Sequence, residues 1–359
     1  MKNVMTVGAA LLLTTSIASA GGLDRSGQPI GVIFEEGNYV ELSFGQVTPD
    51  ITGTLATAGG TQKSGGIAPD YTQFGFAFKA QINEQISLAL IFDQPYGADV
   101  DYDTAGYILL GSGAEVESTG ITALARYEID QNFSVHGGLR QTSAKGVYRV
   151  TALPDLDGPD GPGMATPPYA STYSEDSGVG YVVGAAYERP EIALRVALTY
   201  NSEVDLELDG TVGDLSTTMP ESVNLDFQTG IAADTLLFGS IRYVAWDGFA
   251  LSDTVAGDIL SYDDDVFTYN IGVGRRFSEE FSGSVAIGYE TSTGDPTSNL
   301  GPTDGYLSLQ VGGAYTLTTG VEVSGGVRFV NIGDADTTIN AEFEDNTAVG
   351  VGLKVAYSF

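Results

Sequence analysis

The sequence contains no cysteine and only one histidine, His136, in 359 residues. Without cysteine the chain forms no disulfide, no thiolate metal site and no thiol nucleophile. A single imidazole is also too few for the zinc sites that are built from several histidines. These absences exclude a disulfide-rich fold and most thiol-dependent and zinc-dependent enzymes. We therefore expect no cofactor, no bound metal and no catalytic residue.

Positive charge is scarce as well. The chain has 15 Lys and Arg residues against 47 Asp and Glu, a formal net charge of −32. Such a chain repels nucleic acids and anionic lipid surfaces, so we expect no nucleic-acid partner. Most of the carboxylates are expected to lie in solvated loops. The acidic runs at 155–160 and 263–265 leave one alternative open, in which divalent ions bridge them to lipopolysaccharide phosphates.

Long hydrophobic runs are missing too. We find no uninterrupted apolar stretch of about 18 residues, the length that suits a membrane-spanning helix. Residues 1–20 have the parts of a secretory signal peptide: a basic start at Lys2, a short apolar run at 7–13, and small residues ending at Ala20. We predict cleavage near Ala20 and export of the mature chain. A helical membrane protein does not fit this pattern.

What the chain does have is a regular alternation of side chains. Apolar or aromatic residues occupy every second position in many runs, as at Val349, Val351, Leu353 and Val355. A period of two is the signal of a β-strand. The predicted strands number fourteen and span 38–46, 71–80, 84–92, 117–129, 132–142, 178–188, 191–201, 220–231, 235–246, 265–277, 281–291, 305–317, 320–331 and 346–359.

The connections between these strands alternate in length. Short turns, such as those at 130–131, 189–190 and 318–319, alternate with long polar segments such as 154–177 and 250–264. In bacterial outer-membrane barrels the short turns are periplasmic and the long loops are extracellular. The pattern therefore predicts an all-β fold, a transmembrane antiparallel β-barrel of about fourteen strands, over residues 38–359. A soluble β-sandwich is the alternative, but it gives no reason for such sorting of loops.

The chain ends on alternating apolar residues up to Phe359. This ending resembles the C-terminal signal that outer-membrane insertion machinery recognises, so we expect that machinery as a partner. Aromatic residues near the predicted strand ends suit the girdles at the two membrane interfaces, where they contact outer-membrane lipid and lipopolysaccharide. Trp246 belongs either to the outer girdle or to the interior, because the alternation does not fix its face. The predicted location is the outer membrane of a Gram-negative bacterium.

Alternation also assigns a face to each charged side chain. If the apolar side chains face lipid, most of the scarce basic residues face the lumen. A guanidinium binds a carboxylate through two hydrogen bonds, which suits an anionic head group such as that of a fatty acid. The alternative is that the basic residues pair with lumenal glutamates such as Glu41, Glu128 and Glu188. The candidate ligand-binding residues are Arg140, Arg242, Arg328, Arg195, Arg126 and Lys79, of which the first three are predicted to lie at one level.

Two other features bear on function. The loop residues Met164, Tyr169 and Tyr173 are unusually apolar for a surface segment, and we take them as candidates for an outer groove that captures a hydrophobic substrate. His136 is predicted to face the lumen together with Ser134. A hydrolase would need such a pair oriented by a third group, and nothing in the sequence places a trio together. We therefore interpret His136 as a polar lumenal side chain.

Several short segments occur in the order and spacing of a known family. They are Gln81-Ile82-Asn83-Glu84, the run 92–97, the run 187–204, and the run 219–223 followed by 243–246. Over most of the mature chain they resemble the FadL/TodX family of outer-membrane transporters for long-chain fatty acids and aromatic hydrocarbons. The resemblance implies an N-terminal hatch folded into the lumen, here residues 21–37, and a lateral exit near the third strand. In place of that family's Asn-Pro-Ala motif the chain has Glu35-Glu36-Gly37-Asn38.

Together these observations predict a passive transporter that takes up hydrophobic compounds, foremost long-chain fatty acids, by lumenal binding and lateral release. No nucleotide-binding motif supplies an energy source. We expect a monomer and no enzymatic activity. Two alternatives stay open: a diffusion porin for small polar solutes, and a structural or adhesive barrel without a ligand.

Overall fold

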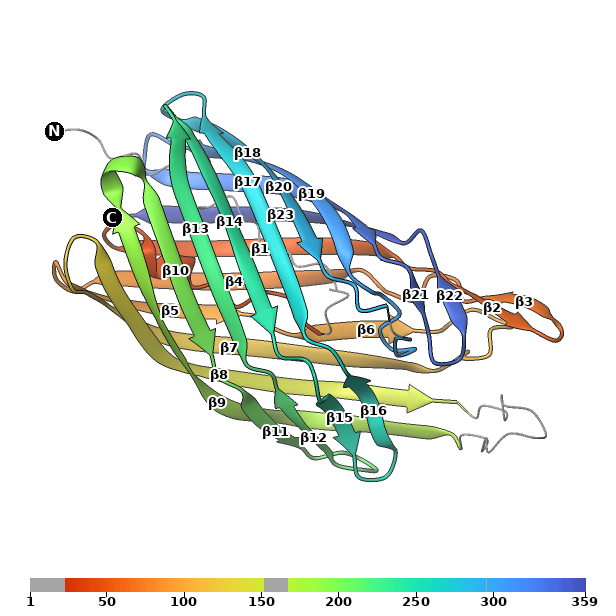
Figure 1. The fold of residues 1–359 in the computed structure, drawn as a ribbon. Coiled ribbons are helices and arrows are strands. Elements are labelled where there is room, and N and C mark those ends of the chain that lie inside the picture. The colour runs from red at the N-terminus through yellow and green to blue at the C-terminus, as the bar shows by residue number, and fades with distance from the viewer. Residues whose placement is uncertain (1–22, 152–166, 295) are drawn as a thin grey trace.

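The computed structural model describes residues 23–151, 167–294 and 296–359. The predicted signal peptide, the first two residues of the predicted hatch, and Met164 lie outside the described residues. Figure 1 shows a barrel of tilted strands, with small additional sheets at the end opposite the C-terminus. Among the helices in the described part of the chain, none is long and apolar enough to cross a membrane.

The barrel wall is one antiparallel sheet of fifteen strands, closed by the pairing of β5 with β7. Two of the fifteen, β5 and β6, are successive pieces of the third wall strand, so the wall has fourteen strands, as the sequence predicts. In chain order the wall strands are β1 (Tyr39–Asp50), β4 (Tyr71–Gln81), β5 (Ile86–Asp93) with β6 (Gly97–Asp101), β7 (Gly113–Glu128), β8 (Phe133–Val150), β9 (Tyr169–Arg189), β10 (Leu194–Asn201), β13 (Ser222–Ala232), β14 (Thr235–Val244), β17 (Val266–Arg276), β18 (Phe281–Glu290), β19 (Tyr306–Thr316), β20 (Val321–Ile332) and β23 (Thr347–Ser358).

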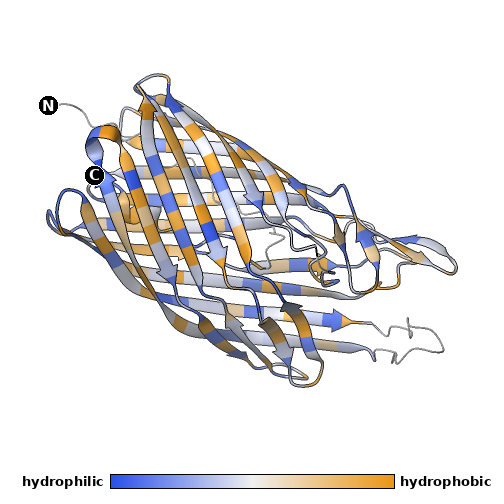
Figure 2. Cartoon of the chain, viewed as in Figure 1, coloured by the Kyte–Doolittle hydropathy of each residue, from blue (hydrophilic) through white to orange (hydrophobic). Residues whose placement is uncertain are grey.

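The two faces of the wall differ as the alternation predicts. In β18, Val285, Ile287 and Tyr289 point outward and are about half exposed, at 49%, 50% and 49%, while Ser284 and Glu290 on the other face are buried. The same alternation recurs along the wall as bands of hydrophobic and hydrophilic colour in Figure 2. A continuous belt of exposed apolar side chains is stable only in contact with lipid.

The short connections are held by side chains that accept hydrogen bonds from the turn's own backbone. Asp130 accepts from the backbone N–H groups of Asn132 and Phe133, both at 2.8 Å. Asn83 accepts in the same way from Gln85 and Ile86, both at 2.9 Å. Asp and Asn favour such turns because their short side chains mimic a backbone carbonyl. These turns lie at the same end of the barrel as the C-terminus (Figure 1).

At the other end the wall continues beyond the predicted strands. β7, β8 and β9 are 16, 18 and 21 residues long, so β8 ends and β9 begins well inside the region predicted as a loop. The long connection predicted at 250–264 does join two wall strands, β14 and β17, but most of it forms a β-hairpin. Two small sheets form here: β11 (Val204–Leu208), β12 (Leu215–Met219), β15 (Phe249–Asp253) and β16 (Gly257–Tyr262), and β2 (Thr54–Thr57), β3 (Gly60–Lys63), β21 (Ala335–Asp336) and β22 (Ala341–Phe343).

The chain before β1 lies inside the barrel. Residues 23–37, the N-terminal segment, include one turn of 3-10 helix, η1 (Gly31–Phe34). Ile30 and Ile33 of this segment are buried against Ala89, Ile91 and Leu124 of the wall. A second 3-10 turn, η2 (Pro190–Ile192), forms a short connection between β9 and β10. The lumen is thus occupied by the chain's own N-terminal segment.

Candidate ligand-binding site in the barrel lumen

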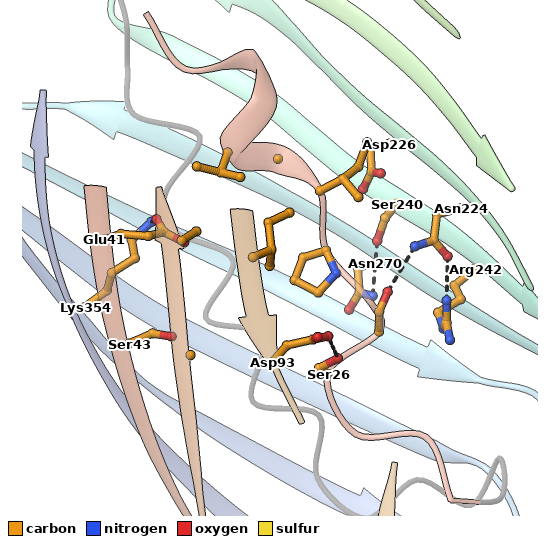
Figure 3. A pocket seen from close by; sticks show the side chains of 18 of the residues that line it. Ser26, Glu41, Ser43, Asp93, Asn224, Asp226, Ser240, Arg242, Asn270 and Lys354 are labelled. Carbon is orange, nitrogen blue, oxygen red and sulfur yellow. Dashed lines mark hydrogen bonds and ion pairs between the residues drawn. The ribbon is translucent and has the colours of Figure 1, made fainter. Parts of the chain in front are cut away.

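A cavity of about 290 Å³ lies between the N-terminal segment and the wall. Its apolar lining includes Pro29, Ile30 and Val32 from the segment, with Ile91 of β5 and Phe238 of β14 opposite them. Figure 3 shows the polar lining, with Asp226, Ser240 and Asn270 on one side of the segment and Ser43, Glu41 and Lys354 on the other. A mainly apolar cavity with a few polar groups is the usual form of a small-molecule site.

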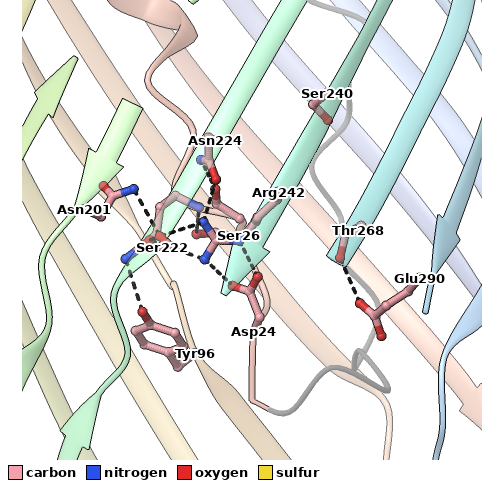
Figure 4. A network of polar contacts seen from close by, with 12 residues as sticks. Asp24, Ser26, Tyr96, Asn201, Ser222, Asn224, Ser240, Arg242, Thr268 and Glu290 are labelled. Carbon is pink, nitrogen blue, oxygen red and sulfur yellow. Dashed lines mark hydrogen bonds and ion pairs between the residues drawn. The ribbon is translucent and has the colours of Figure 1, made fainter. Parts of the chain in front are cut away.

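Arg242 of β14 lines this cavity but is already bound to the N-terminal segment. Its Nε and Nη2 donate to Asp24, at 2.6 and 3.2 Å, and its Nη1 donates to Asn224 and Ser222, at 2.8 and 3.1 Å (Figure 4). A bidentate bond of this kind is strong and oriented. The predicted alternative, pairing with a carboxylate, therefore holds for Arg242, although its partner comes from the segment and not from the wall.

Arg140 of β8 belongs to the same network but does not line the cavity. It donates from Nε to Thr122 at 2.7 Å and from Nη1 to Asn201 at 3.2 Å. Asn201 in turn donates to Ser222 at 3.2 Å, so the network runs on to Arg242. A continuous chain of polar contacts thus joins these two arginines, which the sequence predicts to lie at one level.

Arg126 and Lys79 hold the N-terminal segment and also lie outside the cavity lining. Lys79 donates to the backbone oxygens of Glu35 and Gly37, at 2.6 and 3.0 Å. Arg126 forms ion pairs with Glu128, at 3.2 Å, and with Glu188. Its guanidinium also lies 4.9 Å from the centre of the Phe34 ring. Both residues therefore hold the end of the segment nearest to β1.

Arg195 and Arg328 do line the cavity. The Arg195 guanidinium lies 4.8 Å from the centre of the Phe34 ring, the same ring that Arg126 contacts. Arg195 also donates a hydrogen bond to Gln228 at 3.2 Å. Within the described ranges no ion pair joins Arg195 to a carboxylate. Arg328 donates to Ser308 at 2.9 Å and to Tyr306 at 3.1 Å. Of the six candidates, the structure brings Arg195, Arg242 and Arg328 together around the cavity.

His136 lies beside η1, where its ring and the Phe34 ring pack at right angles with their centres 5.7 Å apart. Its Nε2 is 3.0 Å from the Thr199 hydroxyl, while Ser134 accepts a hydrogen bond from Arg126. The two side chains thus have different partners. In the part of the chain that the structure describes, no group of three or more His, Cys, Asp or Glu residues is placed to hold a metal ion.

A second, smaller cavity of about 40 Å³ lies between the long ends of β7 to β9 and the β11-β12-β15-β16 sheet, beside the start of the N-terminal segment. Its lining is almost entirely apolar and includes Leu23, Val116, Tyr173, Leu215 and Leu251. Tyr169 and Tyr173 were predicted to lie in a surface loop, but both belong to β9, and Tyr173 is buried where it lines this cavity. Tyr169 is adjacent, since both phenols donate to Asp253, at 2.6 and 2.7 Å.

Trp246, whose face the alternation left open, points inward. It is 1% exposed and packs against Tyr96, Phe249 and Tyr262, with ring centres 6.2, 4.8 and 5.3 Å away. Sequence reasoning missed the roles of Asp24, Arg25 and Phe34. Nothing in their local pattern marks them, because their partners lie on distant wall strands.

The third wall strand is interrupted next to the lumenal cavity. β5 ends at Asp93 and β6 begins at Gly97, with Pro95 between them. Proline cannot donate to a strand ladder, so it gave a sequence signal for such a break. The N-terminal segment pairs here instead: Arg25 N donates to the Pro95 oxygen at 2.7 Å, and Gly97 N donates to the Leu23 oxygen at 2.8 Å.

A closed fourteen-strand barrel with an apolar belt, a lumen occupied by its own N-terminal segment and a ligand-sized cavity is a membrane transport barrel. The family model for outer membrane protein transport proteins (OMPP1/FadL/TodX) matches residues 33–358, so the chain belongs to this outer-membrane family.

Solved structures agree with the fold. A Pseudomonas aeruginosa FadL homologue superimposes with a TM-score of 0.74 at 13% identity, over 95% of this chain and 96% of its own. The Pseudomonas putida toluene transporter TodX gives 0.67 at 13% identity, over 90% and 91%. The Ralstonia pickettii toluene transporter TbuX gives 0.64 at 14% identity, over 91% and 90%. No curated protein matches the chain.

Proposed function

We propose that this protein carries hydrophobic compounds passively across the outer membrane. A compound is captured at the outer apolar groove near Tyr173, bound in the lumenal cavity, and released sideways at the interruption of the third wall strand. The observation that carries the proposal is the 290 Å³ cavity, with its apolar lining next to that interruption. The toluene transporters among the similar structures support a hydrophobic cargo.

We further propose long-chain fatty acids as the main cargo, with the carboxylate at Arg195. Two other cations at the cavity are already engaged, Arg242 with Asp24 and Lys354 with Glu41 at 3.1 Å. Arg195 has an amide partner and an aromatic ring, so its guanidinium keeps donors for a ligand. The apolar side chains of the segment and Phe238 then contact the hydrocarbon tail.

The test compares a long-chain fatty acid with the alcohol of the same length, each displacing a fluorescent fatty acid from the purified protein. The parent should bind the acid more tightly, and Arg195→Gln should weaken acid binding about tenfold, or about 1.4 kcal/mol, without changing alcohol binding. Arg189→Ala is the matched control, because Arg189 lies at the periplasmic rim and pairs with Glu191.

Equal binding of acid and alcohol by the parent would contradict the fatty-acid assignment and favour a neutral hydrocarbon. No binding of either, together with a large steady conductance, would favour a diffusion porin. We also propose that the signal peptide is cleaved near Ala20 when the chain is exported, and that the barrel works as a monomer. N-terminal sequencing of the mature protein should therefore begin near Gly21.

A further inference from the structure

The interruption of the third wall strand is bounded on both sides by backbone hydrogen bonds. Below it, β4 and β5 pair from Phe76↔Phe92 down to Gln81↔Ser87. Above it, the Asp101 N–H of β6 donates to the Ile67 oxygen at 2.9 Å. Between these two points, the first residues of β4 pair with β1 but not with the third wall strand. There the contact is made by a side chain, since the Gln94 amide oxygen accepts a hydrogen bond from the Phe74 N–H at 2.8 Å. The backbone ladder is therefore missing over a short, bounded length of wall.

The side chain of Arg25 spans this interruption. Its guanidinium lies 4.0 Å from the centre of the Tyr71 ring, at the start of β4. On the other side, a Cβ built on Gly97 of β6 would lie 2.8 Å from the Arg25 Cζ, so the guanidinium lies directly against this strand. Arg25 thus packs between the two strands that the ladder fails to join.

The lumenal cavity ends at the same place. Gln73 of β4, and Asp93 and Gln94 at the end of β5, are among its lining residues. A ligand leaving the cavity sideways along this path therefore meets Arg25. Carboxylates at Asp99, Glu115 and Glu117 on the adjoining strands favour the guanidinium at this position electrostatically.

Arg25 is carried by residues 23–26, which we call the strap. The strap is tied to the third wall strand by three backbone hydrogen bonds around Pro95, the two given above and one from Ser26 N to the Pro95 oxygen at 3.4 Å. The Ser26 hydroxyl also donates to Asp93, at 2.5 Å. On its other side, Asp24 is bound to Arg242 across the lumen. The backbone that carries Arg25 can leave the wall only if these contacts break, so the strap holds Arg25 at the interruption.

We propose that Arg25 is the residue that closes the lateral path, and that the strap withdraws it when ligand passes from the cavity to the membrane. This inference rests on the lateral release in the proposed function and assigns the closing role to one side chain. A merely structural Arg25 would change stability and binding. If Arg25 closes the lateral path, its substitution changes the rate of ligand release and leaves binding at the cavity unchanged.

The test measures both quantities on the full-length protein with a fluorescent C18 fatty acid. Equilibrium binding is measured in detergent, and release is measured as transfer into phosphatidylcholine vesicles after reconstitution. Arg25→Ala should keep the dissociation constant within about twofold and speed release at least about fivefold. Arg25→Met, which keeps length without charge, should give a smaller increase. Arg149→Ala is the matched control, because Arg149 pairs with Asp101 on the exposed outer wall.

A second measurement locks the strap. The chain has no cysteine, so Ser26→Cys with Asp93→Cys introduces the only two thiols. In the oxidised protein the cavity should still bind the fatty acid, whereas release should slow at least about tenfold and recover on reduction. Each single cysteine variant serves as a control for the lost hydrogen bond.

Release at the parent rate from both Arg25 variants would overturn the proposal, and so would equal release from the oxidised and reduced double variant. If parent and variants alike deliver the ligand into the aqueous interior of the vesicles and not into their lipid, the lateral route of the proposed function fails first. The vesicle compartment that receives the ligand thus separates the two failures.

Discussion

At the scale of single residues, the lumen is governed by how each buried cation is satisfied. Arg242 is 7% exposed, and its ion pair with Asp24 joins β14 to the N-terminal segment across 218 positions of sequence. Removing one partner of such a pair leaves an uncompensated buried charge, whereas removing both leaves none. The pair therefore fixes the segment in place even if its net contribution to stability is small.

This reasoning predicts a strong non-additivity. Arg242→Ala and Asp24→Ala should each destabilise the folded barrel by about 3 kcal/mol, and the double variant should cost clearly less than the sum. The measurement is denaturant unfolding followed by the emission of Trp246, the only tryptophan. Strictly additive losses would show that the two side chains do not act as a pair.

A second residue-scale prediction concerns Gly184 of β9. A Cβ at this position would collide with His136 Nε2 and with the Leu198 oxygen of the neighbouring strand. Gly184→Ala should therefore displace His136 from Thr199 and destabilise the barrel by about 2 kcal/mol. Gly274→Ala is a matched control, because a Cβ there would lie at an ordinary 3.6 Å from its nearest neighbour, the Phe238 ring. Equal unfolding midpoints for the two variants would contradict the collision.

At the scale of elements, the β15–β16 hairpin is attached to β9 by one carboxylate. Asp253 accepts from the phenols of Tyr169 and Tyr173 and from two backbone N–H groups of its own turn, at Val255 and Ala256. Burial acts to raise the pKa of Asp253, but these hydrogen bonds outweigh it, and the pKa lies below the ordinary 3.8. The carboxylate form therefore stabilises the docked hairpin.

The sign of the pH dependence follows. Because the folded pKa is depressed, the contribution of Asp253 is complete above about pH 4 to 5 and is lost as the pH falls through the folded value. Emission of Trp246, which packs on Phe249 of β15, should change in a transition below pH 3.8. Asp253→Asn should lack that transition. Asp258→Asn, in the same hairpin but bonded to Ser252, should keep it.

At the scale of the whole molecule, the lumen is blocked by the chain's own N-terminal segment. Phe34 lies between the guanidinium groups of Arg126 and Arg195, and Lys79 holds the backbone just after it. Cations over an aromatic ring contribute roughly 0.5 to 2 kcal/mol each, so this contact is a firm anchor for the segment. The segment consequently occupies the lumen, and we expect the parent protein to form no open pore.

Electrical recording tests that conclusion. The parent should show no large steady conductance in planar bilayers, while deletion of residues 23–34 should produce one, because the wall strands remain paired without the segment. Phe34→Ala should give brief openings, since it removes the side chain held by both arginines. A large conductance from the parent would mean that the N-terminal segment does not seal the lumen.

Much of the fold follows from the sequence because a strand's alternation is local. Residues such as Val285, Ile287 and Tyr289 fix which face meets lipid, and therefore which basic side chains face inward. The strands β2, β11, β15 and β22 were missed because they are three to five residues long. A period of two cannot be established over so few positions, and polar composition made them look like loops.

By itself, then, the sequence determined the number of wall strands, their two faces and the inward direction of the scarce basic charge, since these depend on neighbours along the chain. Only the tertiary structure decided which of those cations pair with a carboxylate, as Arg242 does with Asp24, and which bond to an amide, as Arg195 does with Gln228. It also decided that Arg25, from the N-terminal segment, lies at the interruption of the third wall strand. The reason is that these contacts join the N-terminal segment to strands far away in the sequence. Which residues meet there is set only when the barrel closes.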